Sequence, residues 1–162
     1  MTDQLTNEQY KNEKAIFLFN QSTRLTEHEL FQLAENSYPK GSPWPVETYK
    51  SELTETYSEY GIVLQQGKKV GFIGYTQLFD EVEITTFGIL KAFNNQGIGQ
   101  LFLQSFIAFL KDKEVKMIFL EVREQNKPAI TVYEKAGFKT IAVRKNYYHD
   151  PIENALIMQL SM

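Results

Sequence analysis

The sequence contains no cysteine and only two histidines, His28 and His149. Without cysteine, the chain can form no disulfide, no thiolate metal site and no thiol nucleophile. Two histidines are too few for a histidine-rich zinc site, and they give little support to a Ser-His-Asp triad. We therefore expect no metal cofactor.

Long apolar runs and runs of like charge are also missing. No apolar stretch approaches the ~20 residues that span a bilayer, and residues 1–14 lack the apolar segment of a secretory signal. Lys and Arg number 17 against 20 Asp and Glu, a net charge of −3, and no basic run stands out. Such a balance gives little support to binding of nucleic acid or of an anionic membrane. We expect a cytoplasmic protein with neither partner.

The length fits one domain. The 162 residues are 43% hydrophobic, which suits a single core, whereas two domains would each be small. Residues 1–13 are polar and are expected to form a flexible N-terminal segment. The domain is therefore expected over residues 14–162.

The first half predicts strands and helices from local signals. Residues 14–20 have the apolar run of a strand. Thr26 and Glu29 have the spacing of a capping box, which predicts a helix that ends near Ser37. Pro45 is placed to open a second helix.

Three strands are then expected as an antiparallel meander, over residues 60–66, 69–79 and 81–90. A two-residue hairpin turn at Gly67–Lys68 would join the first two.

The second half alternates strands and helices. Residues 94–99 open a helix, and residues 117–122 are apolar on both faces, as in a buried central strand. Asn126 can cap the next helix, which would end at Gly137, and two strands, over 138–144 and 154–160, close the chain. This order predicts an α/β fold, in the sense of an α+β mixed sheet with helices on both faces.

The segment NNQGIG (94–99) separates a predicted strand from a predicted helix. Gly97 and Gly99 would let the backbone approach an anion, with the first N–H groups of the helix directed at it. The segment lacks the third glycine of a dinucleotide fingerprint and the lysine of a P-loop. From spacing alone, an anion site and a plain tight turn remain equally open.

Two further residues can carry chemistry. Glu121 shares one face of its strand with Met117 and Phe119. This favours a functional carboxylate, because burial of an ionised group is costly; the alternative is a strand end where Glu121 pairs with Arg123 or solvent. Tyr133 lies on a short helix, and its spacing alone indicates core packing.

Three aromatic residues lie in predicted loops: Trp44, Tyr147 and Tyr148. Aromatic side chains in loops can line a binding cleft, or they can cover the end of a small core. For any single one of them, core packing is the simpler interpretation.

Taken together, these motifs resemble the GNAT-type N-acetyltransferases. FGILKAFNNQGIGQLFL is similar to the acetyl-CoA motif of that superfamily, and LEVREQNKPAITVYEKAGF to the two motifs that follow it. Three segments are similar to the ribosomal-protein-alanine N-acetyltransferases, the RimI group: LEVREQNKPAITVYEKAGF, RKNYYHDPIENALIM and SPW. The resemblance covers about Phe87 to Met158, and a weaker similarity extends over Leu25–Leu53. It implies a single GNAT-like domain whose N-terminal meander is splayed from the C-terminal half.

The resemblance implies a role for each matched residue. Glu121 matches the general base and Tyr133 the general acid, which replaces the packing interpretation of Tyr133. The expected acceptor contacts are Trp44, Tyr147 and Tyr148. The expected acetyl-CoA contacts are Phe87, Gly88 and Ile89 for the acetyl-pantetheine arm, Asn95, Gln96, Gly97, Ile98, Gly99 and Gln100 for the pyrophosphate, and Asn126 beside the arm.

Two departures from the family pattern stand out. The loop Asn94–Gln100 carries no basic residue, so amide groups and the helix dipole are left to hold the pyrophosphate, with Lys91 or Lys127 as possible compensation. The acidic pair that precedes the last strand in the family is Glu153–Asn154 here.

The implied function is direct transfer of an acetyl group from acetyl-CoA to the N-terminal amine of a protein. The implied acceptor is the N-terminal peptide of a ribosomal protein, with an alanine in first place. Two alternatives remain open: a GNAT enzyme that acetylates another amine, either a small molecule or a lysine, and a non-catalytic acyl-CoA-binding module, which the missing loop cations favour.

Overall fold

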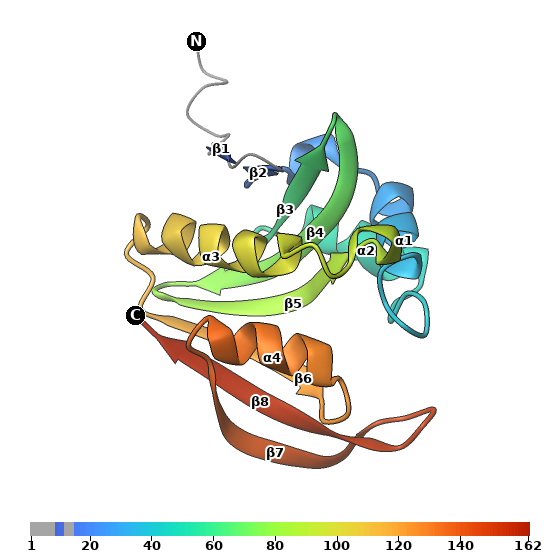
Figure 1. Cartoon of the computed structure of the whole chain (residues 1–162), viewed down its shortest axis with the longest axis vertical. Helices are drawn as coiled ribbons and strands as arrows, with labels where there is room; N and C mark the ends of the chain where they lie inside the picture. The colour runs from blue at the N-terminus through green and yellow to red at the C-terminus, as the bar shows by residue number, and fades with distance from the viewer. Residues whose placement is uncertain (1–8, 12–14) are drawn as a thin grey trace.

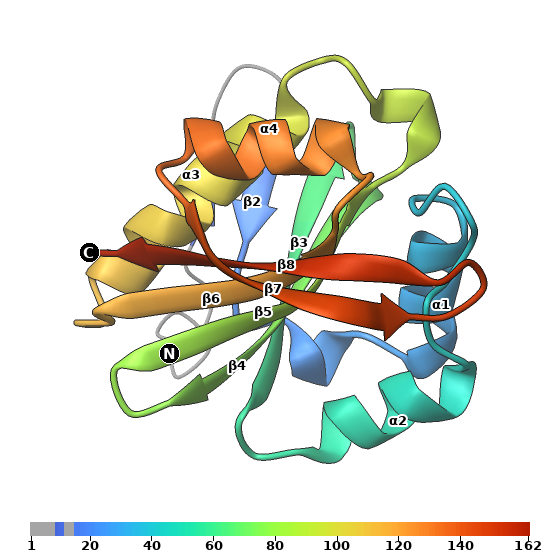
Figure 2. The ribbon, with the colours of Figure 1, turned by 90° about the horizontal axis from the view of Figure 1, so that it is seen from below.

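The computed structural model describes residues 9–11 and 15–162. Eight strands form one mixed sheet in the order β1-β2-β3-β4-β5-β6-β8-β7. Helices α3 and α4 cover one face, and α1 and α2 lie on the other (Figures 1 and 2). The α/β fold with a mixed sheet and helices on both faces is confirmed.

The element bounds are as follows. The strands are β1 (Gln9–Lys11), β2 (Ile16–Leu18), β3 (Ser58–Gln65), β4 (Lys68–Leu78), β5 (Glu81–Ile89), β6 (Met117–Arg123), β7 (Lys139–Tyr148) and β8 (Glu153–Ser161). The helices are α1 (Glu27–Glu35), α2 (Val46–Thr54), α3 (Ile98–Lys111) and α4 (Lys127–Lys135), with 3-10 turns η2 (Ser22–Arg24) and η3 (Lys91–Phe93).

The expected flexible segment 1–13 falls largely outside the described residues. Its described part, Gln9–Lys11, forms β1 and pairs antiparallel with β2. These three residues therefore have regular structure, which we did not expect.

The predicted helix caps are confirmed. The Glu29 N–H donates to Thr26 Oγ1 at 3.2 Å, and the Thr26 N–H donates to Glu29 Oε2 at 2.9 Å, which completes the capping box of α1. In α4, the Ala129 N–H donates to Asn126 Oδ1 at 3.3 Å. Gly137 ends α4 with a φ of 103°, a left-handed conformation that glycine adopts without strain.

The turn between β3 and β4 lies one residue earlier than we expected. It consists of Gln66 and Gly67, whose φ values are 52° and 76°, and Lys68 is already the first residue of β4. Two successive positive φ values are typical of the type I′ turn, whose twist matches that of the flanking strands.

Two strand predictions are wrong in part. β7 continues to Tyr148, so Tyr147 and Tyr148 lie on a strand rather than in a loop. β6 is buried on one face alone, where Ile118, Leu120 and Val122 pack beneath α3 and α4. The reason is that the core under α1 and α2 involves β3 and β4, so that this layer leaves β6 partly uncovered.

The sheet opens between β5 and β6. The two strands pair in parallel from Glu81–Met117 to Ile84–Leu120, and their pairing ends there. At the same point Gly74 of β4 pairs with Thr86 while Tyr75 pairs with Ile84, which leaves Thr85 as the extra residue of a β-bulge. Bulges bend and twist the strand that carries them. Past Thr85, β5 stays with β4 and diverges from β6, and this is the splay that the family resemblance implies.

Candidate active site

The gap between β5 and β6 exposes backbone groups of β5. The Leu90 N–H donates to Val70 O on the β4 side at 2.8 Å. Since successive residues of a strand direct their N–H and C=O groups to opposite sides, Phe87 and Ile89 direct theirs into the gap. Gly88 directs its groups toward β4, and a Cβ at Gly88 would lie 2.8 Å from Ser37 Cβ. The close approach of the α1 end therefore explains the glycine at this position.

The loop before α3 has the geometry of an anion site. Asn95 and Gly97 have φ values of 62° and 77°, and Gly97 is the N-cap of α3 without a side-chain cap. The first N–H groups of a helix have no partner within the helix, and its dipole attracts negative charge. The helix start adjoins β5, because a Cβ at Gly99 would lie 3.6 Å from Ile89 Cγ1. Gln100 adds a buried Nε2 atom that has no hydrogen-bond partner.

No residue of this loop is basic, so a compensating cation must come from outside it. Lys91 lies in η3 and Lys127 is the first residue of α4, and both are exposed. Lys68, at the start of β4, places its Nζ 5.8 Å from the centroid of the Phe93 ring. Sequence reasoning missed Lys68, because the start of β4 is remote in the chain from the loop.

Tyr133 is buried on the α4 side of the gap. Its ring packs against Phe87 and Phe138, with centroid distances of 6.0 and 5.8 Å. Burial, and to a lesser degree the nearby Tyr38 and Tyr148, raise the pKa of the Tyr133 phenol far above its usual value. The hydroxyl therefore stays protonated and can donate a hydrogen bond.

Glu121 lies on the other face of the sheet, in the part of β6 that has left β5. Its Oε1 accepts a hydrogen bond from Arg144 Nη1 at 3.1 Å. The carboxylate also lies close enough to Tyr147 to raise the pKa of that phenol. The alternative partner Arg123 is wrong, because Arg123 pairs with Glu153 at 3.3 Å. Arg144 of β7 thus orients the carboxylate.

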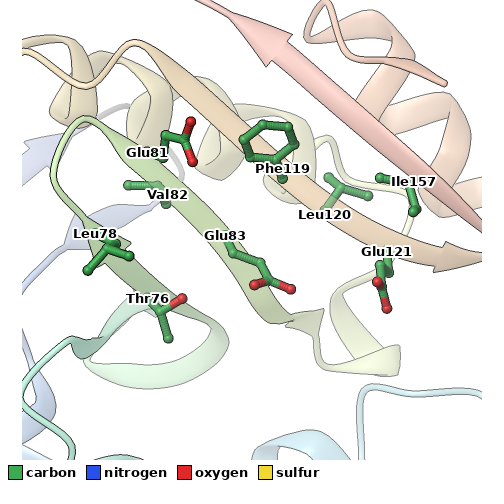
Figure 3. A pocket seen from close by; sticks show the side chains of 9 residues that line it. All are labelled: Thr76, Leu78, Glu81, Val82, Glu83, Phe119, Leu120, Glu121 and Ile157. Atoms are coloured by element: carbon green, nitrogen blue, oxygen red, sulfur yellow. The ribbon is translucent and has the colours of Figure 1, made fainter. Parts of the chain in front are cut away.

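A cavity of about 360 Å³ adjoins Glu121 on this face (Figure 3). Figure 3 shows the Glu83 and Glu121 side chains reaching from neighbouring strands toward the same open space. Burial first, and then the Glu121 charge, raise the pKa of Glu83. Among the described residues, no cation forms an ion pair with Glu81 or Glu83. The cavity suits a cationic or amine group. Its lining comprises Thr76, Leu78, Glu81, Val82, Glu83, Phe119, Leu120, Glu121 and Ile157.

Tyr148, the last residue of β7, interacts electrostatically with both candidate catalytic groups. Burial, followed by the Glu121 charge, raises the pKa of Tyr148 to about 12, and Tyr148 in turn acts on the pKa of Tyr133. The Arg123 guanidinium stacks on the Tyr148 ring at 4.2 Å, and the rings of Tyr147 and Tyr148 meet edge to face at 5.1 Å. Tyr148 is therefore packed between Arg123 and Tyr147 at the end of β7.

The other predicted contacts are less closely tied to the gap. Trp44 packs against Tyr49 with a centroid distance of 5.3 Å, in the core beneath α1 and α2. Asn126 uses its Oδ1 to cap α4, which leaves its amide N–H groups for a ligand. No group of three or more potential metal ligands is found among the described residues, and no helix in that part of the chain is long and apolar enough to cross a membrane.

Several residues of the site escaped the sequence analysis. Tyr38 lies in the loop after α1, and its Oη accepts a hydrogen bond from the Phe87 N–H at 3.1 Å. Glu83 lies near Glu121 on the neighbouring strand β5, and Arg144 reaches Glu121 from β7, across β8. The alternation of Glu81 and Glu83 along β5 was a readable signal, whereas nothing local marks Tyr38 or Arg144.

Comparisons with known proteins show which family and which relatives this chain is similar to. Residues 27–138 match the model of the acetyltransferase (GNAT) family. The chain is 36% identical over 119 residues to the [ribosomal protein bS18]-alanine N-acetyltransferase of Haemophilus influenzae, which covers 72% of this chain and 80% of that protein. For the Escherichia coli enzyme of the same name, identity is 33% over 120 residues, with 73% and 80% covered. The crystal structure of the ribosomal-protein-S18-alanine N-acetyltransferase from Escherichia coli superposes with a TM-score of 0.76 at 28% identity, over 85% of this chain and 90% of that one.

Proposed function

Because the chain belongs to the acetyltransferase (GNAT) family and is an acetyl-CoA-dependent N-acetyltransferase, we propose that its acceptor is the N-terminal α-amine of a protein. The proposed acceptor residue is the N-terminal alanine of ribosomal protein bS18. The observation that carries this proposal is the 33–36% identity, over nearly three quarters of the chain, to enzymes named for that alanine. The cavity beside Glu121 supports it, because acidic walls suit an amine.

The features at the gap fit acetyl-CoA. The Phe87 C=O and the backbone groups of Ile89 are available to the amides of its pantetheine arm, whereas the Phe87 N–H bonds to Tyr38. The free N–H groups at the start of α3 and the unpaired Gln100 Nε2 offer donors to its pyrophosphate. Without a cation in the loop itself, each such exposed charge–dipole contact contributes only about 0.3–1 kcal/mol. We therefore expect binding to depend on the backbone conformation of the loop.

The acceptor amine must be neutral before it can attack. A terminal α-amine has a pKa of about 7.7–8.0, against about 10.4 for lysine. At pH 7, roughly a tenth of α-amines but only a few in ten thousand lysines are neutral. When the α-amine is still protonated, Glu121 removes that proton, directly or through a water molecule. A carboxylate held in place by Arg144 is sufficient for an α-amine, because so many of these amines are already neutral.

The leaving thiolate needs a hydrogen-bond donor on the opposite flank. Tyr133 occupies that position, beside Phe87 and on the α4 side of the gap. Because burial raises the pKa of this phenol, Tyr133 is better suited to hold a hydrogen bond to the sulfur than to release its proton completely. Its contribution is thus stabilisation of the developing charge.

The test is an acetyl-transfer assay read by intact mass. The acceptors are a peptide with the N-terminal sequence of bS18, the same peptide with a blocked N-terminus, a lysine peptide with a blocked N-terminus, and a small amine. We expect one acetyl group on the first residue of the free peptide and none on the blocked peptides. Preferred acetylation of the lysine peptide or the small amine would refute the acceptor assignment. Binding of acetyl-CoA without transfer to any acceptor would favour a non-catalytic module.

A further inference from the structure

The Tyr38 hydroxyl is fixed at the edge of the gap. Its Oη accepts the Phe87 N–H at 3.1 Å, and this N–H belongs to the group of β5 donors that face β6. The end of α1 is held against β5, since the Lys91 N–H donates to Asn36 O at 3.0 Å and Gly88 leaves room for Ser37. Tyr38 therefore approaches the gap from the α1 side with little freedom to move.

The proton of this hydroxyl has no acceptor among the described residues. Tyr38 Oη acts as an acceptor toward Phe87, which leaves its own O–H as a free donor. Burial raises the pKa of Tyr38 well above the usual value, so the proton remains on the oxygen at any working pH. A donor that feeds into a hydroxyl oxygen also polarises the O–H bond and strengthens it as a donor.

Tyr38 and Tyr133 both contact Phe87, Tyr38 from the α1 side through a hydrogen bond and Tyr133 from the α4 side through its ring. Each lies close enough to Tyr148 for its pKa to be raised by that neighbour, and Tyr38 also raises the pKa of Tyr133. Tyr133 stands on the flank assigned above to the sulfur. The free O–H of Tyr38 lies beside the β5 backbone, and it can donate a hydrogen bond to a second atom on which negative charge develops.

We propose that Tyr38 is a further catalytic residue, whose hydroxyl donates a hydrogen bond to the carbonyl oxygen of the thioester. The proposal rests on the proposed function. As the amine nitrogen bonds to the carbonyl carbon, an electron pair moves to the oxygen; the pair returns when the carbon–sulfur bond breaks, and the amine proton passes to Glu121. Tyr38 transfers no proton. It stabilises the oxygen while that atom carries charge, together with the Ile89 N–H that faces the gap.

The experiment compares Tyr38→Phe with Tyr49→Phe. Both changes remove one buried phenol oxygen, but Tyr49 bonds to Ser42 at 2.9 Å and lies outside the proposed machinery. Loss of one donor to a developing oxyanion lowers turnover on the order of 10²-fold. We expect that loss in kcat for Tyr38→Phe alone, with KM for acetyl-CoA within about threefold of the wild type. Tyr38→His, which restores a ring N–H, should recover part of the loss.

S-ethyl-CoA, a thioether without the carbonyl oxygen, separates this role from a structural one. It should bind the wild type and Tyr38→Phe equally well, because the lost interaction is with an oxygen that it lacks. A tenfold weaker affinity of Tyr38→Phe for S-ethyl-CoA, or a kcat above half the wild-type value, would overturn the proposal. If the wild type transfers no acetyl group, both the proposed function and this role of Tyr38 are refuted. If the wild type and Tyr38→Phe are both active, only the role of Tyr38 is refuted.

Discussion

Replacement of Gly97 by alanine tests whether the loop before α3 holds the pyrophosphate through its backbone. Gly97 has a φ of 77°, and a Cβ built on it would meet no atom within 4 Å. The substitution therefore introduces no clash in the protein. Its cost comes from the left-handed backbone, about 1–2 kcal/mol for a residue other than glycine.

The chain contains a matched control for that cost. Gly67, in the turn between β3 and β4, has a φ of 76° and likewise no atom within 4 Å of a built Cβ. Gly67→Ala should therefore destabilise the fold as much as Gly97→Ala does. One kcal/mol corresponds to roughly 2–4 °C in Tm for a chain of this length, so both variants should melt about 2–8 °C below the wild type.

The two variants should differ in their use of acetyl-CoA. A shifted loop misdirects the first N–H groups of α3 and adds a methyl group where an anion would approach. Loss of one or two charge–dipole contacts, about 0.3–2 kcal/mol in total, would raise KM for acetyl-CoA roughly 2- to 30-fold in Gly97→Ala. Gly67→Ala should keep the wild-type KM. Calorimetric melting and initial rates at varied acetyl-CoA give both numbers, and an equal KM in the two variants would refute the backbone site.

Three further predictions address the other groups. Glu121→Gln and Tyr133→Phe should each lower kcat by 10²-fold or so with acetyl-CoA affinity nearly unchanged, and full activity in both would refute the assignments. Lys69 lowers the pKa of Glu29, so the ion pair stabilises the fold above about pH 4.3, and this stabilisation is lost as pH falls through the lower folded pKa. The free energy of urea unfolding should therefore differ between wild type and Glu29→Gln by less than about 1 kcal/mol at neutral pH, because the pair is so exposed. This difference should disappear in acid, and a difference that grows in acid would contradict the prediction. Gly88→Ala should cost about 1–3 kcal/mol by overpacking against the end of α1, and a melting temperature equal to that of the wild type would show that α1 yields freely.

Features set by neighbours in the chain could be predicted from the sequence. The capping box of Thr26 and Glu29 and the glycine end of α4 depend on contacts within a few residues, and both were found. Tyr147 and Tyr148 were assigned to a loop, because turn residues such as Asp150 and Pro151 follow them closely. Pairing with β8 across the sheet extends β7 to Tyr148, and pairing between distant segments leaves no local mark.

The bulge on β5 involves pairing between strands, but it also leaves a mark in the local sequence. Apolar side chains on the α3 and α4 side of β5 occur at Val82, Ile84, Phe87 and Ile89, so the spacing is two, then three, then two. A regular strand alternates with a period of two, and the extra residue is the bulge that we did not infer from the sequence. The partners of Glu121 could not be inferred in this way, since Arg144 reaches it from a strand whose place in the sheet is set by the order β6-β8-β7.

The bulge also explains why one opening can serve two substrates. Up to Ile84, β5 and β6 form a continuous sheet, and beyond it their backbone groups no longer bond to each other. Helices α3 and α4 cover one face there, with Tyr133 beneath them, whereas the opposite face at Glu121 borders an open cavity. A thioester in the gap would present its sulfur to the covered face and its carbonyl carbon to the open one. The separation of the acyl donor from the amine therefore follows from where the two helix layers end, and Glu121 and Tyr133 need not touch each other to act on the same bond.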